Sequence, residues 1–174
     1  YEELRRLVGK MAVREGLAKP VQRPKTAGAK EKEDGIRKSQ KILLTWLVSD
    51  ERIFGQIKDY ISPEDFSDGI YRKAAGLLFQ QYHDGEINPA RIMNYFTDEE
   101  EHREVAALFH TRIEELTSER EKEKALMETV LRIKNHSIET ATRNLEPTDK
   151  AGLQRLKEAK KELQDLKKLH ISIN

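Results

Sequence analysis

The spacing of apolar residues limits the possible folds of this chain more than any other feature. From residue 36 onward, apolar side chains recur three and four positions apart, which is the period of an α-helix and not the alternation of a β-strand. Residues suited to capping a helix N-terminus stand before successive apolar runs: Asp50, Ser62, Asp68, Asn88 and Asp98. Gly85 stands where one of these helices should stop. The sequence therefore predicts an all-α fold.

The segment from Ser118 to Leu145 contains no proline or glycine. It opens with a capping box, Ser118-x-x-Glu121, and as a helix would be roughly 40 Å long. One stripe along it has a 4-3-4-3-4 spacing: Met127, Leu131, Lys134, Ile138, Ala141 and Leu145. After Pro147 the same spacing returns: Gly152, Leu156, Ala159, Leu163, Leu166 and His170. Two such stripes across a tight turn predict an antiparallel helical hairpin, with Ile138 opposite Leu156 and Leu131 opposite Leu163.

These patterns divide the chain into three parts. Residues 18–35 are rich in charge, proline and glycine and have almost nothing to bury, so 1–35 should be the end of a preceding domain plus a flexible linker. Residues 36–133 should form a multi-helix bundle, and residues 134–174 a C-terminal hairpin subdomain. A second apolar stripe on the long helix stops at Ile133, so we expect its first half to complete the bundle. Because the sequence does not begin with Met, we also expect a fragment of a longer protein.

Composition excludes several classes of protein. The 174 residues include no cysteine, which excludes disulfide scaffolds and thiolate zinc sites. Residues 36–116 carry 15 acidic and 10 basic side chains, which argues against direct nucleic-acid binding by the core. No apolar run approaches the roughly 18–20 residues that a membrane span needs. We therefore expect a soluble protein of the cytoplasm.

No motif in the sequence predicts catalysis. There is no His-Glu-x-x-His pair and no glycine-rich phosphate loop of either common type. His102 and His110 are two helical turns apart, too far to bind one ion, and Asp65 with Asp68 is more simply a corner of the bundle. We expect no catalytic residue, no metal site and no cofactor in this chain.

The hairpin has more apolar residues than one seam can bury. Leu153, Leu169, Ile171 and Ile173 lie off the predicted seam, and exposed apolar side chains on such an element suggest a partner surface. The candidate partner-binding residues are therefore Leu153, Lys160, Leu163, Lys167, Leu169, His170, Ile171 and Ile173. The alternatives are scattered surface leucines and, for the lysines, a solvated face paired with neighbouring acids.

The order of these elements resembles a known family. The matching pieces are the Leu43-Leu44-x-x-Leu47 helix, the helix with Phe54 and Ile57, Pro63-Glu64-Asp65-Phe66, Tyr71-Arg72, Leu77-Leu78-Phe79 and the Gly85 stop. In this order they resemble the C-terminal helicase-interaction domain of bacterial replicative DNA primase, over residues 36–174. The N-terminal domain of the replicative helicase is similar in the same way, but the terminal hairpin after a long helix favours the primase.

The resemblance implies a non-catalytic role. The bundle would modulate the hexameric replicative helicase and priming, and the hairpin would dock on the helicase N-terminal domains at the replication fork. Residues 1–18 would end the RNA-polymerase domain of a primase and 19–35 would be the tether. The zinc-binding cysteines and acidic metal cluster of a complete primase are absent, so this chain should not make primers alone. The N-terminal collar domain of the helicase itself and an unrelated helical adaptor stay open as alternatives.

Overall fold

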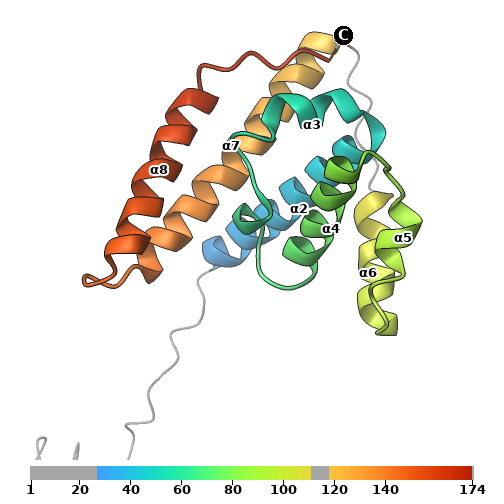
Figure 1. The fold of residues 1–174 in the computed structure, drawn as a ribbon, viewed down its shortest axis with the longest axis horizontal. Helices are drawn as coiled ribbons and strands as arrows, with labels where there is room; N and C mark the ends of the chain where they lie inside the picture. Colours follow the sequence, from blue (N-terminus) through green and yellow to red (C-terminus); the bar gives the residue numbers. More distant parts are fainter. Residues whose placement is uncertain (1–26, 111–117, 174) are drawn as a thin grey trace, which may run out of the picture. The chain divides into compact units, whose positions relative to one another are not determined.

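A computed structural model describes residues 27–110 and 118–173 of the chain (Figure 1). These residues form helices and connecting turns and contain no strand, so the predicted all-α fold is confirmed. The elements are α2 (Ala27–Ser49), α3 (Glu51–Ile57), the 3₁₀ turn η1 (Pro63–Asp65), α4 (Ile70–Asp84), α5 (Pro89–Met93), α6 (Glu99–Phe109), α7 (Glu119–Asn144) and α8 (Lys150–Leu166). The helix predicted in residues 1–18 lies outside the described residues.

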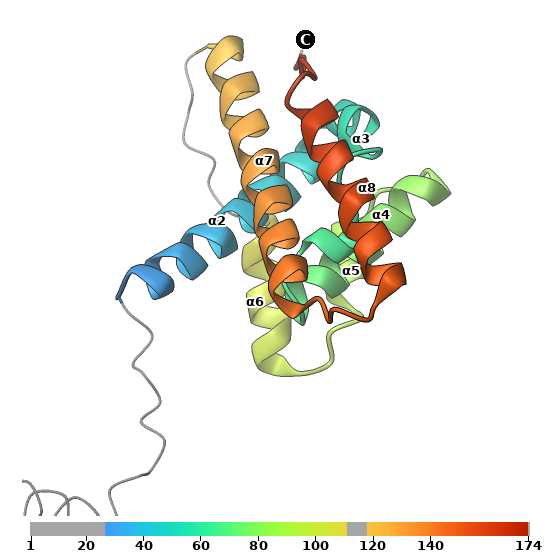
Figure 2. The same cartoon turned by 90° about the vertical axis from the view of Figure 1, so that its left-hand side faces the viewer.

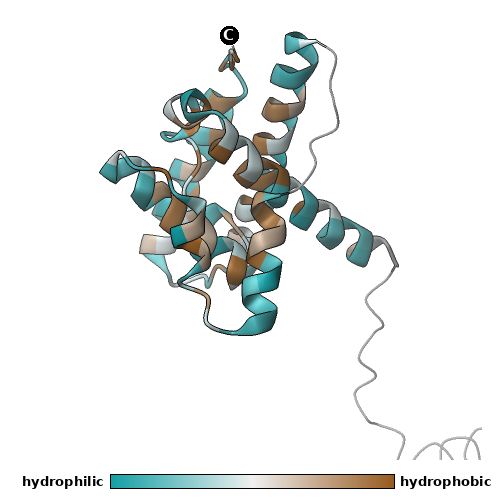
Figure 3. Cartoon of the chain, turned by 90° about the vertical axis from the view of Figure 1, so that its right-hand side faces the viewer, coloured by the Kyte–Doolittle hydropathy of each residue, from teal (hydrophilic) through white to brown (hydrophobic). Residues whose placement is uncertain are grey.

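The chain divides into two units, Tyr1–Lys32 and Glu33–Asn174. The second unit contains every buried residue described below, and the boundary predicted at 133/134 falls inside α7. The predicted linker extends too far, because α2 already begins at Ala27. Residues 29–34 are mostly Ala, Lys and Glu, which favour helix even where they bury nothing, so the helix extends beyond the apolar pattern. Figure 3 shows these first turns of α2, next to the grey trace, in the hydrophilic colour.

Most helices begin where the capping residues predict. Asp50 accepts a hydrogen bond from the Arg52 backbone N–H, and Asn88 and Asp98 cap α5 and α6 in the same way. Ser118 and Glu121 form the predicted capping box of α7. These caps satisfy the backbone N–H groups that a first helical turn leaves unpaired.

The start of α4 differs from the prediction. Its N-cap is Gly69, with φ 86°, and not Asp68. Because only glycine adopts a positive φ without steric cost, Gly69 makes the sharp entry into the helix. The carboxylate of Asp68 instead forms an exposed ion pair with Arg72, 2.5 Å away.

The main core lies among α2 to α7, and Leu166 at the end of α8 also enters it. Its fully buried side chains come from every helix of the bundle: Leu43, Leu44, Leu47, Ile53, Ile57, Ile61, Phe66, Leu78, Ile92, Leu108, Leu126 and Ile133. Polar bonds tie the same helices together. The Thr45 hydroxyl donates to the Leu108 carbonyl, which joins α2 to α6, and the Gln40 amide donates to the Ser67 hydroxyl at 2.7 Å.

The helix α7 belongs to the bundle and also to the hairpin. Its first half contributes Leu126, Val130 and Ile133 to the main core, as the second apolar stripe predicts. Its second half lies against α8, with the two helices running in opposite directions in both views (Figures 1 and 2). The hairpin is therefore built on a helix that the bundle core already fixes.

A partly buried tyrosine, Tyr82 of α4, should make the bundle sensitive to alkaline pH. The Tyr82 hydroxyl donates to the Leu47 carbonyl of α2, and the ring stacks on Phe54 with centroids 4.0 Å apart. Burial raises the pKa of this phenol to about 12. In the unfolded chain a tyrosine loses its proton at about pH 10. Between pH ~10 and about 12 the unfolded state therefore binds fewer protons than the folded state, so the free energy of unfolding falls as the pH rises.

We expect Tyr82→Phe to cost about 1 kcal/mol at pH 7, through the lost hydrogen bond, and to reduce the loss of stability between pH ~10 and about 12. Urea unfolding at several pH values measures both effects. Tyr95→Phe is the control, because this side chain is 61 % exposed and should leave the stability at pH 7 within about 0.5 kcal/mol. An equal alkaline loss in wild type and Tyr82→Phe would contradict the expectation.

Candidate interaction surface

The seam between α7 and α8 is a small apolar cluster beside the main core, and Leu131 packs against both. Ile138 from α7 and Leu156 and Leu163 from α8 are buried together, and Leu131, Leu145 and Ala159 pack against them. The facing pairs predicted from the two heptad stripes are therefore in one cluster. Leu163 is 9 % exposed and belongs to this seam, so it serves the fold of the hairpin and is not open to a partner.

A buried lysine joins this hairpin to the bundle. The Nζ atom of Lys134 lies 3.0 Å from Oδ2 of Asp65 in η1 and 2.8 Å from Oε2 of Glu162 in α8. The side chains of Lys134 and Asp65 are 5 % and 7 % exposed, whereas that of Glu162 is 44 % exposed. The ammonium group of Lys134 thus links α7, from which it comes, to the bundle and to the last helix.

Asp65 is held in place from its own side. Its Oδ2 atom also accepts a hydrogen bond from the Ser62 backbone N–H, 2.9 Å away, so the carboxylate closes the 3₁₀ turn as well as neutralising the lysine. A buried charge is tolerated only when it is paired and hydrogen-bonded, and here both conditions are met.

Sequence reasoning identified both residues but not their pairing. Lys134 occupies a seam position of the heptad stripe, where a charged residue is costly unless it has a partner. The charge at this apolar position is therefore the feature of the sequence from which a buried ion pair could be predicted. The partner could not be found from spacing, because Asp65 is 69 residues away in the chain.

The last residues lie differently from the expectation. We expected Leu169, Ile171 and Ile173 to be surplus apolar groups open to a partner. Ile171 is instead 2 % exposed and belongs to the main core, and Leu169 and Ile173 are partly buried against the same core. The expected exposed flank is therefore wrong for these three residues.

The path of the chain after α8 explains why these three side chains are buried or partly buried. The helix ends at Leu166, four residues before the apolar stripe does, and residues 167–173 run back toward α3 and the start of α7 (Figure 1). We call these residues the C-terminal strap. A hairpin with unburied leucines gains by folding its own end onto the bundle, because apolar burial contributes about 25 cal/mol per Å².

The remaining candidate residues are exposed, and all of them except Leu153 are polar or charged. Leu153 is 44 % exposed, and Lys160, Lys167 and His170 are exposed as well. Charged and amide side chains on the same helix pair locally, as in the bond from Gln154 to Glu158 at 2.9 Å. On the outer face of α8, Leu153 therefore stands as an apolar side chain amid polar and charged ones.

Two grooves border the hairpin. One, of about 430 Å³, lies between the η1 loop and the second half of α7 and is lined by Glu64, Ser67, Arg72, His136, Thr140 and Asn144 among others. A backbone N–H and the Ser62 hydroxyl hydrogen-bond to the Glu64 carboxylate and keep its pKa below the usual value. The other, of about 340 Å³, lies between the start of α7 and the strap.

Within residues 27–110 and 118–173, no group of three or more His, Asp or Glu side chains is placed to hold a metal ion. In the same residues no helix is both long and apolar enough to cross a bilayer.

Comparison of the chain with protein-family models, with curated proteins and with solved structures found no match.

The roles of the two acids that flank Lys134 can be separated by mutation. We expect Lys134→Met to cost about 3–5 kcal/mol, because it leaves the buried Asp65 carboxylate without a cation. Glu162→Gln should cost less than about 1 kcal/mol, since Glu162 is largely solvated. Urea unfolding followed by circular dichroism measures both values.

The double variant Lys134→Met/Asp65→Asn serves as the control for this pair. Removing both charges should recover part of the loss that Lys134→Met causes alone. Similar costs for Lys134→Met and Glu162→Gln would show that burial does not distinguish the two acids.

Proposed function

We propose that this chain is a non-catalytic helicase-interaction domain of a bacterial DNA primase. In this role it docks the primase on the N-terminal domains of the hexameric replicative helicase, in the cytoplasm at the replication fork, and modulates helicase and priming activity. The observation that carries the proposal is the shared helix α7, which completes the bundle with one half and supports a two-helix hairpin with the other. This arrangement is the one that the resemblance of residues 36–174 implies.

The geometry suits a docking element. The seam and the Lys134 ion pairs fix α8 on the bundle before any partner arrives. A preorganised surface loses less conformational entropy on binding than a mobile one. The exposed residues of the hairpin would meet the helicase, with Leu153 of α8 as apolar anchor and Lys160 of α8 and Lys167 of the strap as charged residues.

Such a surface would bind one site weakly. A helicase ring repeats the site around its axis, and tethering to a common assembly raises the effective concentration of each contact. In this proposal the chain carries no cofactor and acts by binding protein alone, without nucleic-acid contacts of its own.

The proposal is tested by titrating the chain with the replicative helicase of the same organism. We expect co-elution of the two proteins, and a loss of affinity of about tenfold or more for Leu153→Glu/Lys160→Glu. Both residues are exposed, so the variant should keep the melting temperature and helicity of the wild-type chain. Isothermal titration calorimetry measures the affinity.

Arg103→Glu on α6 is the matched control. The Arg103 side chain is 79 % exposed, and the substitution reverses a charge on a helix outside the hairpin. Self-association of the chain without helicase would favour the helicase collar domain instead. Failure of the chain to bind helicase, with no self-association, would leave an unrelated adaptor.

A further inference from the structure

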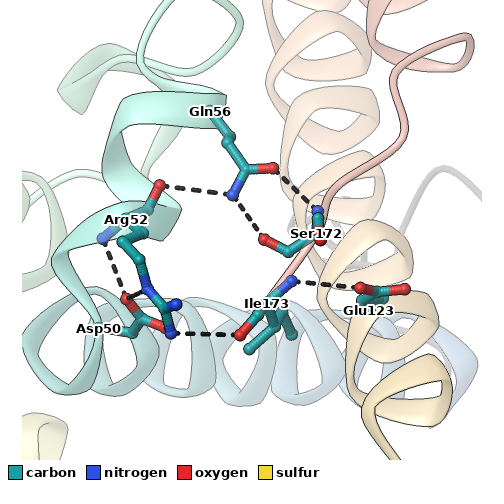
Figure 4. Close-up of polar contacts among 6 residues, drawn as sticks. All are labelled: Asp50, Arg52, Gln56, Glu123, Ser172 and Ile173. Atoms are coloured by element: carbon teal, nitrogen blue, oxygen red, sulfur yellow. Dashed lines mark hydrogen bonds and ion pairs between the residues drawn. The ribbon is translucent and has the colours of Figure 1, made fainter.

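The C-terminal strap is attached mainly through its backbone. The Gln56 amide donates to the Ser172 carbonyl at 2.7 Å and accepts from the Ser172 N–H at 2.9 Å, which forms a two-bond fork (Figure 4). Arg52 donates to the Ile173 carbonyl, and the Ile173 N–H donates to Glu123 of α7. Long side chains of α3 and α7 therefore hold the strap by its main-chain groups.

One side chain of the strap reaches the main core. Ile171 is 2 % exposed, whereas Leu169 and Ile173 are only partly buried and the side chain of His170 is 87 % exposed. Beside the strap lies the groove of about 340 Å³, with Met127, Leu169 and Ile171 in its lining. A segment with one deep anchor and an open side has the low local packing that characterises independently opening parts of proteins.

The two donors on α3 that hold the strap, Arg52 and Gln56, would not be stranded by its departure. Arg52 also donates to both carboxylate oxygens of Asp50, at 3.0 and 2.8 Å, and its side chain is 60 % exposed. The Gln56 amide also donates to the Arg52 carbonyl at 3.4 Å. Release of the strap therefore leaves these donors with a partner or with water, and the penalty for an unsatisfied buried polar group does not arise.

The buried charge would also survive the release. Lys134 is paired with Asp65 in the bundle and with Glu162 in α8, and both acids come before the strap in the chain. Opening residues 167–173 thus breaks neither ion pair and leaves the α7–α8 seam closed.

From these contacts we propose that the C-terminal strap is a releasable latch. It opens from α3 and α7 while the bundle and the hairpin stay folded, and Gln56 holds it shut. Closed, it covers the apolar side chains of Leu169, Ile171 and Ile173; open, it exposes them together with the core site that Ile171 leaves. The latch is a property of this chain alone and holds whether or not the proposed helicase partner is the right one.

The absence of cysteine makes the latch measurable by thiol labelling. Ile171→Cys places one thiol in the strap, and Val130→Cys places one in the main core, where residue 130 is 0 % exposed. Labelling of the folded full chain is followed with a thiol reagent at low urea concentrations. We expect residue 171 to react at least about tenfold faster than residue 130, with a much weaker dependence on urea, since local opening exposes little surface.

Gln56→Ala then tests the fork. It should speed labelling at residue 171 by about tenfold, which corresponds to about 1.4 kcal/mol for the lost pair of hydrogen bonds, and leave residue 130 unchanged. Gln80→Ala is the matched control, because Gln80 bonds to Asp84 on α4. It should change neither rate.

Because Ile171→Cys removes part of the anchor, a second measurement uses the chain without it. The backbone N–H groups of Ser172 and Ile173 should exchange with deuterium faster than those of the main core, and faster still in Gln56→Ala. Exchange and labelling of the strap at the same rate and urea dependence as the core would overturn the latch. So would an unchanged strap in Gln56→Ala.

Discussion

The pairing of Lys134 with Asp65 is the interaction on which the rest of the arrangement depends. An ammonium group buried to this degree would be costly without a carboxylate within hydrogen-bond distance. Asp65 reaches it from the η1 turn, 69 residues earlier in the chain, and is itself fixed by the Ser62 N–H. The position of α7 against the bundle is therefore set by a polar contact as well as by Leu126, Val130 and Ile133.

Glu162 connects α8 to this ion pair with only a small desolvation penalty. Because Asp65 already neutralises the lysine, the second acid can stay half-solvated and still orient α8. A charge in an apolar seam also distinguishes one register of the hairpin from its neighbours, since a shift of α8 by a turn would separate Glu162 from Lys134. The heptad pattern alone repeats and cannot make that distinction.

Local signals in the sequence predicted most of the fold. The caps at Asp50, Asn88 and Asp98 and the box at Ser118 depend on neighbouring residues, so they could be read from short stretches. The hairpin followed from two matching periods. The predictions failed where the outcome depends on distant parts of the chain, as for the buried anchor Ile171. Spacing showed that Ile171 lay off the seam of α8, but not that the main core of the bundle would accept it.

The strap also changes what a partner can find on the hairpin. Stable interfaces bury about 800 Å² per partner, with an apolar centre surrounded by polar groups. The outer face of α8 offers Leu153 among charged and amide side chains, and the helix, at 17 residues, is only roughly 25 Å long. With the strap closed this face suits weak, reversible contacts, whose strength on a repeating partner comes from their number. With the strap open, three further apolar side chains become available at the opposite end of α8. If the chain has the proposed partner, the proposed latch would set the affinity of the hairpin together with the face that α8 presents.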